Sequence, residues 1–195
     1  WTVGGVQTFQ IGAAAVHLPY IIGLAGAALW MFTMVNAVNF MDGANGLAMG
    51  SVAVGLVALT AIALERGSPD GAAVALCGTA ALVGFLIWNF PSGRLFAGDS
   101  GALFAGAIAA FASLIVIVRT GLSPFVPPLL FFPLLADALL TLLFRARQGQ
   151  PLFVAHTHHI YQRAMAAWRR HAPVSRAYWA ATVACGGVAF VAARD

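Results

Sequence analysis

Apolar residues fill long stretches of this chain, and polar residues gather in the short segments between them. The apolar stretches cover roughly residues 20–36, 47–64, 72–90, 102–118, 124–144 and 176–193. Each is close to the roughly 20 residues that a helix needs to cross a bilayer core. Backbone amides in hydrocarbon must be satisfied within their own segment, and strand-length alternation is absent. We therefore expect an all-α, polytopic membrane protein with about six transmembrane helices.

The composition supports this interpretation. Of 195 residues, 61% are hydrophobic and only 8% are charged, and the mean hydropathy is +0.89, outside the range of soluble domains. Six crossings use up the length, so residues 1–195 form a single transmembrane domain whose expected partner is membrane lipid and not nucleic acid. Both Cys77 and Cys185 lie in apolar stretches, where a thiol is usually a packing residue.

The arginines predict the orientation. If all six stretches cross, segments 37–46, 91–101 and 145–175 share one side of the membrane. That side carries seven of the ten basic residues and the other side three, so the positive-inside rule makes the first side cytoplasmic. The two groups are Arg94, Arg145, Arg147, Arg163, Arg169, Arg170 and Arg176 against Arg66, Arg119 and Arg194.

The first cytoplasmic segment, "NAVNFMDGANG", places polar groups at the end of a crossing. Asn36, Asn39 and Asp42 are spaced three apart and so share one helix face. Asn45 is a natural N-cap for a helix opening at Gly46, and such a helix start attracts phosphate. Capping and close packing of small residues are the alternative explanation.

The second segment, "NFPSGRLFAGDSGALFAG", holds Asp99 in a glycine-rich turn, and Ser100 can cap the next helix. Asp42 and Asp99 would repel each other and any phosphate, and a divalent cation removes that conflict. Mg²⁺ commonly binds one or two carboxylates together with substrate phosphates, so we expect Mg²⁺, with Mn²⁺ as a substitute. Simple pairing of Asp99 with Arg94 is the alternative.

The third segment, "AHTHHIYQRAMAAWRRH", predicts an amphipathic helix in the cytoplasmic loop 145–175. In a helix, His156, His159 and Arg163 share one face and offer donors to phosphate oxygens. A zinc site and a helix lying on anionic headgroups are the alternatives. In the second alternative the lipid-facing residues are Ile160, Tyr161, Met165 and Trp168.

Asp137 lies inside the fifth predicted crossing, where a carboxylate is costly unless it is paired or faces an aqueous cavity. Four prolines in the same stretch favour a broken helix: Pro124, Pro127, Pro128 and Pro133. A structural pair and a polar cavity both remain open for Asp137.

These motifs, in this order on one face, resemble the polyprenyl-phosphate N-acetylhexosamine-1-phosphate transferases, over essentially the whole chain. The resemblance implies that undecaprenyl phosphate attacks the β-phosphorus of a UDP-N-acetylhexosamine and releases UMP, with Mg²⁺ on the diphosphate. It implies an enzyme of the bacterial plasma membrane that initiates O-antigen, lipopolysaccharide or cell-wall polymer synthesis, and it leaves a homodimer open.

The resemblance also assigns residue roles. Asp99 and Asn39 match the metal site, Asp42 and Asp99 the catalytic pair, and Asn45 the nucleoside contact. The substrate-binding set implied by the resemblance and the spacing is Asn36, Asn39, Asn45, Arg94, His156, His159 and Arg163.

Two departures stand out. Asn45 replaces the second aspartate of the family's D-G-x-D-G motif, and the family's paired-aspartate motif D-D-x-x-[KD] is absent. The second departure predicts an N-terminally truncated piece that is inactive by itself. The alternative functions are a multipass transporter, disfavoured because the polar groups gather at one surface, and a CDP-alcohol phosphotransferase, which needs aspartates that 47–64 lacks.

Overall fold

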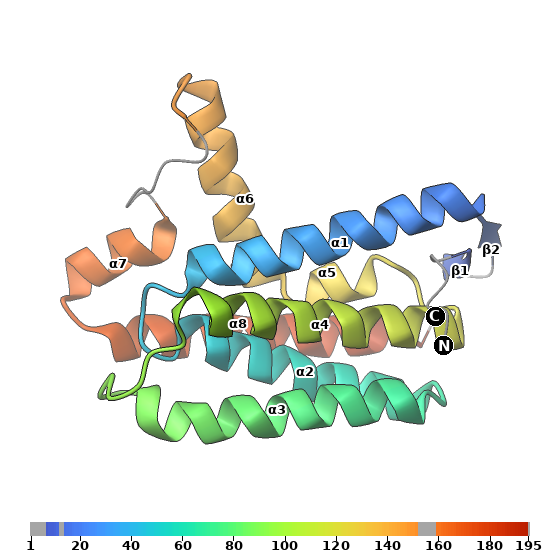
Figure 1. Cartoon of the computed structure of the whole chain (residues 1–195), viewed down its shortest axis with the longest axis horizontal. Coiled ribbons are helices and arrows are strands. Elements are labelled where there is room, and N and C mark those ends of the chain that lie inside the picture. Colours follow the sequence, from blue (N-terminus) through green and yellow to red (C-terminus); the bar gives the residue numbers. More distant parts are fainter. Residues whose placement is uncertain (1–6, 12–13, 152–158, 195) are drawn as a thin grey trace.

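The structure, a computed structural model, describes residues 7–11, 14–151 and 159–194 and is predominantly helical (Figure 1). This confirms the predicted all-α polytopic class. In chain order the elements are β1 (Thr8–Ile11), β2 (Ala14–His17), α1 (Tyr20–Met41), α2 (Leu47–Glu65), α3 (Pro69–Asn89), α4 (Gly98–Thr120), α5 (Val126–Leu130), α6 (Phe132–Arg147), α7 (Ile160–Trp168) and α8 (His171–Ala192).

Five of the described helices are long and apolar enough to cross a membrane: α1, α2, α3, α4 and α8. They lie side by side along one direction in Figure 1. The apolar window of α2 is 67% buried and that of α4 is 56% buried, against 22% for α1 and α3. The core is therefore centred on α2 and α4, and the outer helices present apolar faces outward, as expected for a protein in lipid.

Small residues allow these helices to approach closely. A side chain at Gly50 of α2 would begin 2.1 Å from the indole nitrogen of Trp179 on α8. On α4, a side chain at Gly106 would begin 2.7 Å from the Cα of Val35 on α1. Close packing at small residues is a common way to associate helices where no hydrophobic driving force operates between them.

The predicted fifth crossing, 124–144, is not one straight helix. It is divided into α5 and α6 at Phe131, and α6 stands at a steep angle to the bundle (Figure 1). Pro133, at the start of α6, has no backbone N–H to continue the ladder of α5. Neither α5 nor α6 is among the five candidate spans in the described part of the chain.

The ends of the elements also differ from the prediction. The last crossing begins at His171 rather than near residue 176, and α6 continues to Arg147. The antiparallel hairpin of β1 and β2 was not predicted, because four-residue strands are too short to show alternation. The hairpin lies at the opposite end of the bundle from α7 (Figure 1). There it is joined to the end of α4, because Gln10 N–H donates to Gly121 O at 2.8 Å.

Three separate connections meet at one end of the bundle, which we call the Asp42 end. They are the turn between α1 and α2, the loop between α3 and α4, and α7 with the start of α8 (Figure 1). This sorting follows from successive helices that reverse direction, as the sequence predicted.

Candidate functional site

The centre of the Asp42 end is formed by residues far apart in the sequence. Asn39 lies in the last turn of α1, and Asp99 lies in the first turn of α4. The Asn39 amide nitrogen lies 3.3 Å from Asp99 Oδ1, although 60 positions separate the two residues. Asp42 directly follows α1 and is half-buried, whereas Asp99 is exposed. The site therefore has a shielded carboxylate beside an accessible one.

The two carboxylates interact electrostatically. Burial, and after it the negative charge of Asp99, raises the pKa of Asp42 from 3.8 to about 6. Two carboxylates that repel each other in this way favour a bound cation, because positive charge between them offsets the repulsion.

The donor atoms here fit magnesium better than zinc. The described residues contain no group of three or more histidine, cysteine, aspartate or glutamate side chains able to hold a metal. Two carboxylates and an amide instead offer a small set of hard oxygen donors. Mg²⁺ uses such incomplete protein sets together with water and phosphate oxygens. Asp99 and Asn39 would hold the ion, with Asp42 contributing negative charge nearby.

Asn45 does not cap α2 as predicted. Gly46, in the left-handed conformation with φ +74°, is the N-cap of α2, and no side chain caps this helix. The Asn45 amide instead donates to Pro91 O at 3.2 Å, and its backbone N–H donates to His171 Nδ1 at 3.1 Å. Ser175 Oγ donates to Asn45 O at 2.7 Å. The prediction of an Asn45 cap was wrong, because tertiary partners took its hydrogen bonds.

Three contributors to this turn were missed from the sequence: Asn89, His171 and Ser175. Asn89 is buried, accepts from Gly46 N–H at 2.6 Å and donates to Leu95 O at 2.7 Å. It therefore joins the turn after α1 to the loop before α4. In the sequence, Asn89 could have been found as a single amide at the end of the apolar stretch 72–90, where a buried polar side chain needs a hydrogen-bond partner.

Other predicted site residues lie near this centre without joining it. The Asn36 amide donates to Phe32 O of its own helix at 2.7 Å. Arg94 is exposed on the loop before α4, and no ion pair between Arg94 and Asp99 occurs among the described residues. Ser100 lies inside α4 and does not cap it, so that prediction was also wrong.

The histidine segment differs from a continuous helical strip. His156 lies outside the described residues. His159 has extended backbone geometry and is the N-cap of α7, in a capping box with Gln162. Its ring is buried, with Nδ1 3.3 Å from Asp137 Oδ1, while Arg163 is exposed. In the alternative of a helix lying on anionic headgroups, Tyr161 would face lipid, but it is 1% exposed. The structural pair, one of the two alternatives for Asp137, is the one observed.

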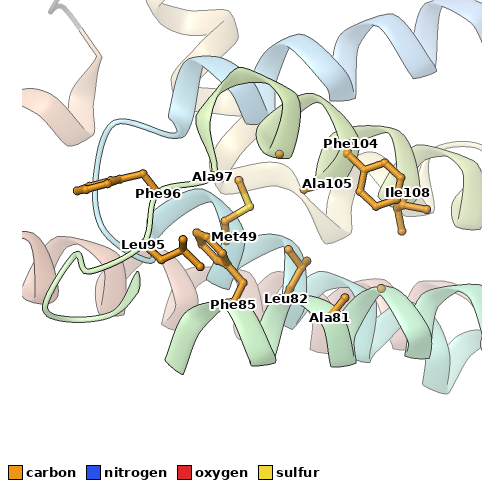
Figure 2. A pocket seen from close by; sticks show the side chains of 12 residues that line it. Met49, Ala81, Leu82, Phe85, Leu95, Phe96, Ala97, Phe104, Ala105 and Ile108 are labelled. Carbon is orange, nitrogen blue, oxygen red and sulfur yellow. The ribbon is translucent and has the colours of Figure 1, made fainter. Parts of the chain in front are cut away.

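An apolar pocket lies at the start of α4, where Ala97 and Gly101 are among its lining residues (Figure 2). It has a volume of about 280 Å³ and is lined by residues of α2, α3, α4 and the loop before α4. Figure 2 shows Met49, Leu95 and Phe85 close together, with Phe104 and Ile108 on the side of α4. The lining has no charged residue, so the pocket suits hydrocarbon and not a diphosphate.

Comparison with known proteins identifies the class. The family model for glycosyl transferase family 4 matches residues 2–117, which include Asn39, Asp42, Asn45 and Asp99. The chain belongs to this family, as the sequence motifs predicted, and it is a helical membrane protein of that class.

Similar curated proteins come from bacteria. A Bacillus subtilis protein named probable undecaprenyl-phosphate N-acetylglucosaminyl 1-phosphate transferase is 31% identical over 162 residues, covering 82% of this chain and 43% of the relative. The phospho-N-acetylmuramoyl-pentapeptide-transferase of Mycobacterium leprae is 30% identical over 214 residues, covering 93% of this chain and 58% of the relative. The enzyme of the same name from Geobacillus thermodenitrificans is 36% identical over 111 residues, covering 52% of this chain and 34% of the relative. The chain spans about half the length of the curated relatives it matches.

Proposed function

We propose that the protein containing this chain transfers an N-acetylhexosamine 1-phosphate from a UDP-sugar to undecaprenyl phosphate and releases UMP. The observation that carries the proposal is the contact between Asn39 and Asp99, with Asp42 beside them, at one end of a bundle of membrane-length helices. Membership of glycosyl transferase family 4 and the names of the relatives agree with this chemistry.

The proposed reaction forms a bond between an oxygen of the lipid phosphate and the β-phosphorus of the UDP-sugar. The bond from that phosphorus to the bridging oxygen breaks, and the electron pair leaves with UMP. Both reactants are anions, so the site must offset negative charge. Mg²⁺, or Mn²⁺ in its place, would supply positive charge on the diphosphate when bound by Asp99 and Asn39.

The remaining residues bind and orient the substrates. Arg94 and Arg163 are exposed at the Asp42 end, and arginine suits phosphate oxygens because its donors form a fixed fork. Asn45 lies in a turn held from two sides, which favours its proposed role as a nucleoside contact. The apolar pocket at the start of α4 offers room for prenyl units of the lipid.

We further propose a cytoplasmic location for the Asp42 end in the bacterial plasma membrane, and a role in starting O-antigen or cell-wall polysaccharide synthesis. Seven of ten arginines lie in the segments at or near this end, which supports the orientation. UDP-sugars are made in the cytoplasm, so the same orientation gives the site access to its donor.

The test uses the complete protein in lipid with UDP-N-acetylglucosamine, undecaprenyl phosphate and Mg²⁺, and measures release of UMP. Asp99→Asn is expected to lower the rate at least about 100-fold, the typical cost of a lost charge-stabilising group in an active site. Asp70→Asn is the matched control, because Asp70 is a partly exposed aspartate paired with Arg119 at the other end of the bundle. Equal rates for the two variants would remove Asp99 from the mechanism, and a wild-type protein that transfers no sugar phosphate to the lipid would refute the proposed function.

A further inference from the structure

Asp137 is a buried carboxylate to which the proposed chemistry assigns no task. It lies on α6, is 1% exposed, and accepts hydrogen bonds from three helices. Thr141 on α6 donates at 3.2 Å, and Tyr178 OH on α8 donates at 2.6 Å. The start of α7 supplies the Ile160 N–H at 2.9 Å and the Tyr161 N–H at 3.0 Å, with His159 Nδ1 at 3.3 Å.

This arrangement makes the position of α7 depend on Asp137. The first N–H groups of a helix have no partners within the helix, and a negative charge there is favourable. Asp137 supplies both the acceptor atoms and the charge from a different helix. With only nine residues, α7 is too short to be stable alone, so its outside partners decide where it lies.

The helix α7 in turn contacts the backbone that carries Asp42. The Tyr161 side chain is buried, and its hydroxyl donates to Phe40 O at the end of α1 at 3.3 Å. A Cβ at Gly43 would lie 2.2 Å from the same hydroxyl oxygen, so only glycine admits the ring here. The phenol therefore lies against the residues before and after Asp42.

We propose that Asp137 is a positioning residue: it fixes α7, and through the Tyr161 ring it holds the turn that presents Asp42 to the substrates. The inference rests on the proposed transferase function for the role of Asp42. Asp137 touches no substrate, because it is enclosed by α6, α7 and α8. Its effect reaches the reaction only through the placement of other residues.

The experiment compares three variants of the complete protein. Asp137→Asn keeps the size of the side chain but turns one acceptor into a donor that faces other donors. Tyr161→Phe leaves α7 anchored and removes only the hydroxyl that contacts Phe40. Thr141→Val is the control, since it removes a bond to the same carboxylate on the side of α6 and leaves α7 untouched.

Two measurements are made on each variant. The first is kcat and KM for the UDP-sugar per amount of folded protein. The second is the distribution of distances between two spin labels, measured by double electron–electron resonance. The labels are attached to cysteines that replace Ser92 and Ala167, both of which are exposed. The background for labelling replaces Cys77, Cys185 and every cysteine outside residues 1–195 by alanine.

For Asp137→Asn we expect kcat to fall about 10- to 100-fold, the usual effect of losing a residue that orients site groups, with KM nearly unchanged. The distance distribution should broaden. Tyr161→Phe should lower kcat by less and keep a narrow distribution, and Thr141→Val should match the wild type in both measurements. If Asp137→Asn does not fold, Asp137→Glu replaces it, because it keeps the charge but moves the carboxylate relative to the Ile160 and Tyr161 N–H groups, and the same fall in kcat and broader distribution are expected.

Two results would overturn the inference: a wild-type kcat in Asp137→Asn, or a lost kcat with an unchanged distance distribution, which would mean direct chemistry by Asp137. If the wild-type protein shows no transfer to the lipid, the proposed function fails. The spin-label distances then still decide whether Asp137 places α7.

Discussion

Replacing Gly50 by alanine tests the packing that supports the Asp42 end. The new Cβ would lie 2.1 Å from Trp179 Nε1 and 2.3 Å from Cε2, so the indole must move. Movement also breaks the hydrogen bond from Trp179 Nε1 to Gly46 O, which is 2.9 Å long and holds the first residue before α2. The substitution therefore disturbs both the core and the turn that carries Asn45.

The expected cost follows from these terms. Overpacking typically costs about 1–3 kcal/mol, and the lost hydrogen bond adds about 1 kcal/mol. Alanine recovers about 1 kcal/mol of this loss, because it is a better helix former than glycine. The net loss of folding free energy is about 1–3 kcal/mol, or a fall in Tm of about 2–12 °C at about 2–4 °C per kcal/mol.

Thermal unfolding of the purified protein in detergent measures this loss. Gly187→Ala is the matched control, because Gly187 is also helical but has no heavy atom within 4 Å of the added Cβ. Its Tm should be unchanged or slightly raised. A Gly50→Ala protein as stable as Gly187→Ala would show that Trp179 does not pack against Gly50.

Three further outcomes are expected. Removing divalent cations with EDTA should stop UMP release, and Mg²⁺ or Mn²⁺ should restore it; continued release in EDTA would exclude the metal. Asn45→Asp, which restores the common family motif, should lower the free energy of unfolding by about 1–3 kcal/mol. The Asn45 amide now donates to Pro91 O at 3.2 Å, and a carboxylate oxygen in its place would repel that carbonyl. An unchanged Tm would show that this hydrogen bond contributes nothing. Asn89→Leu should lower the free energy of unfolding by about 2–4 kcal/mol, because two hydrogen bonds are lost and the buried Gly46 N–H is left without a partner. The same thermal unfolding assay measures this loss. An Asn89→Leu protein as stable as the wild type would mean that Asn89 does not join the two loops.

The sequence was sufficient to predict the gathering of Asn39, Asp42 and Asp99. Long apolar helices joined by short turns must reverse direction, so alternate turns fall at the same end, however far apart they are in the chain. The contact between Asn39 and Asp99 follows from that rule together with the position of each residue at a helix end. The prolines also predicted the break between α5 and α6.

The details that failed depend on partners that no local pattern contains. Asn45 has the preference of a cap residue, but Pro91, His171 and Ser175 supply its hydrogen bonds from other segments. The histidine segment was expected to be helical through His159, whereas α7 begins at Ile160, where Asp137 on another helix accepts its first N–H groups. Tertiary contacts outweighed local propensity at both places.

Binding of Mn²⁺ tests most directly whether these separate segments form one metal-dependent site. Electron paramagnetic resonance can follow free Mn²⁺ during titration of the complete protein with UDP-N-acetylglucosamine present. We predict that the wild type and Asp70→Asn bind Mn²⁺ equally, and that Asp99→Asn and Asn39→Ala bind it much more weakly. Equal binding of Mn²⁺ by all four proteins would contradict a metal site formed by Asp99 and Asn39.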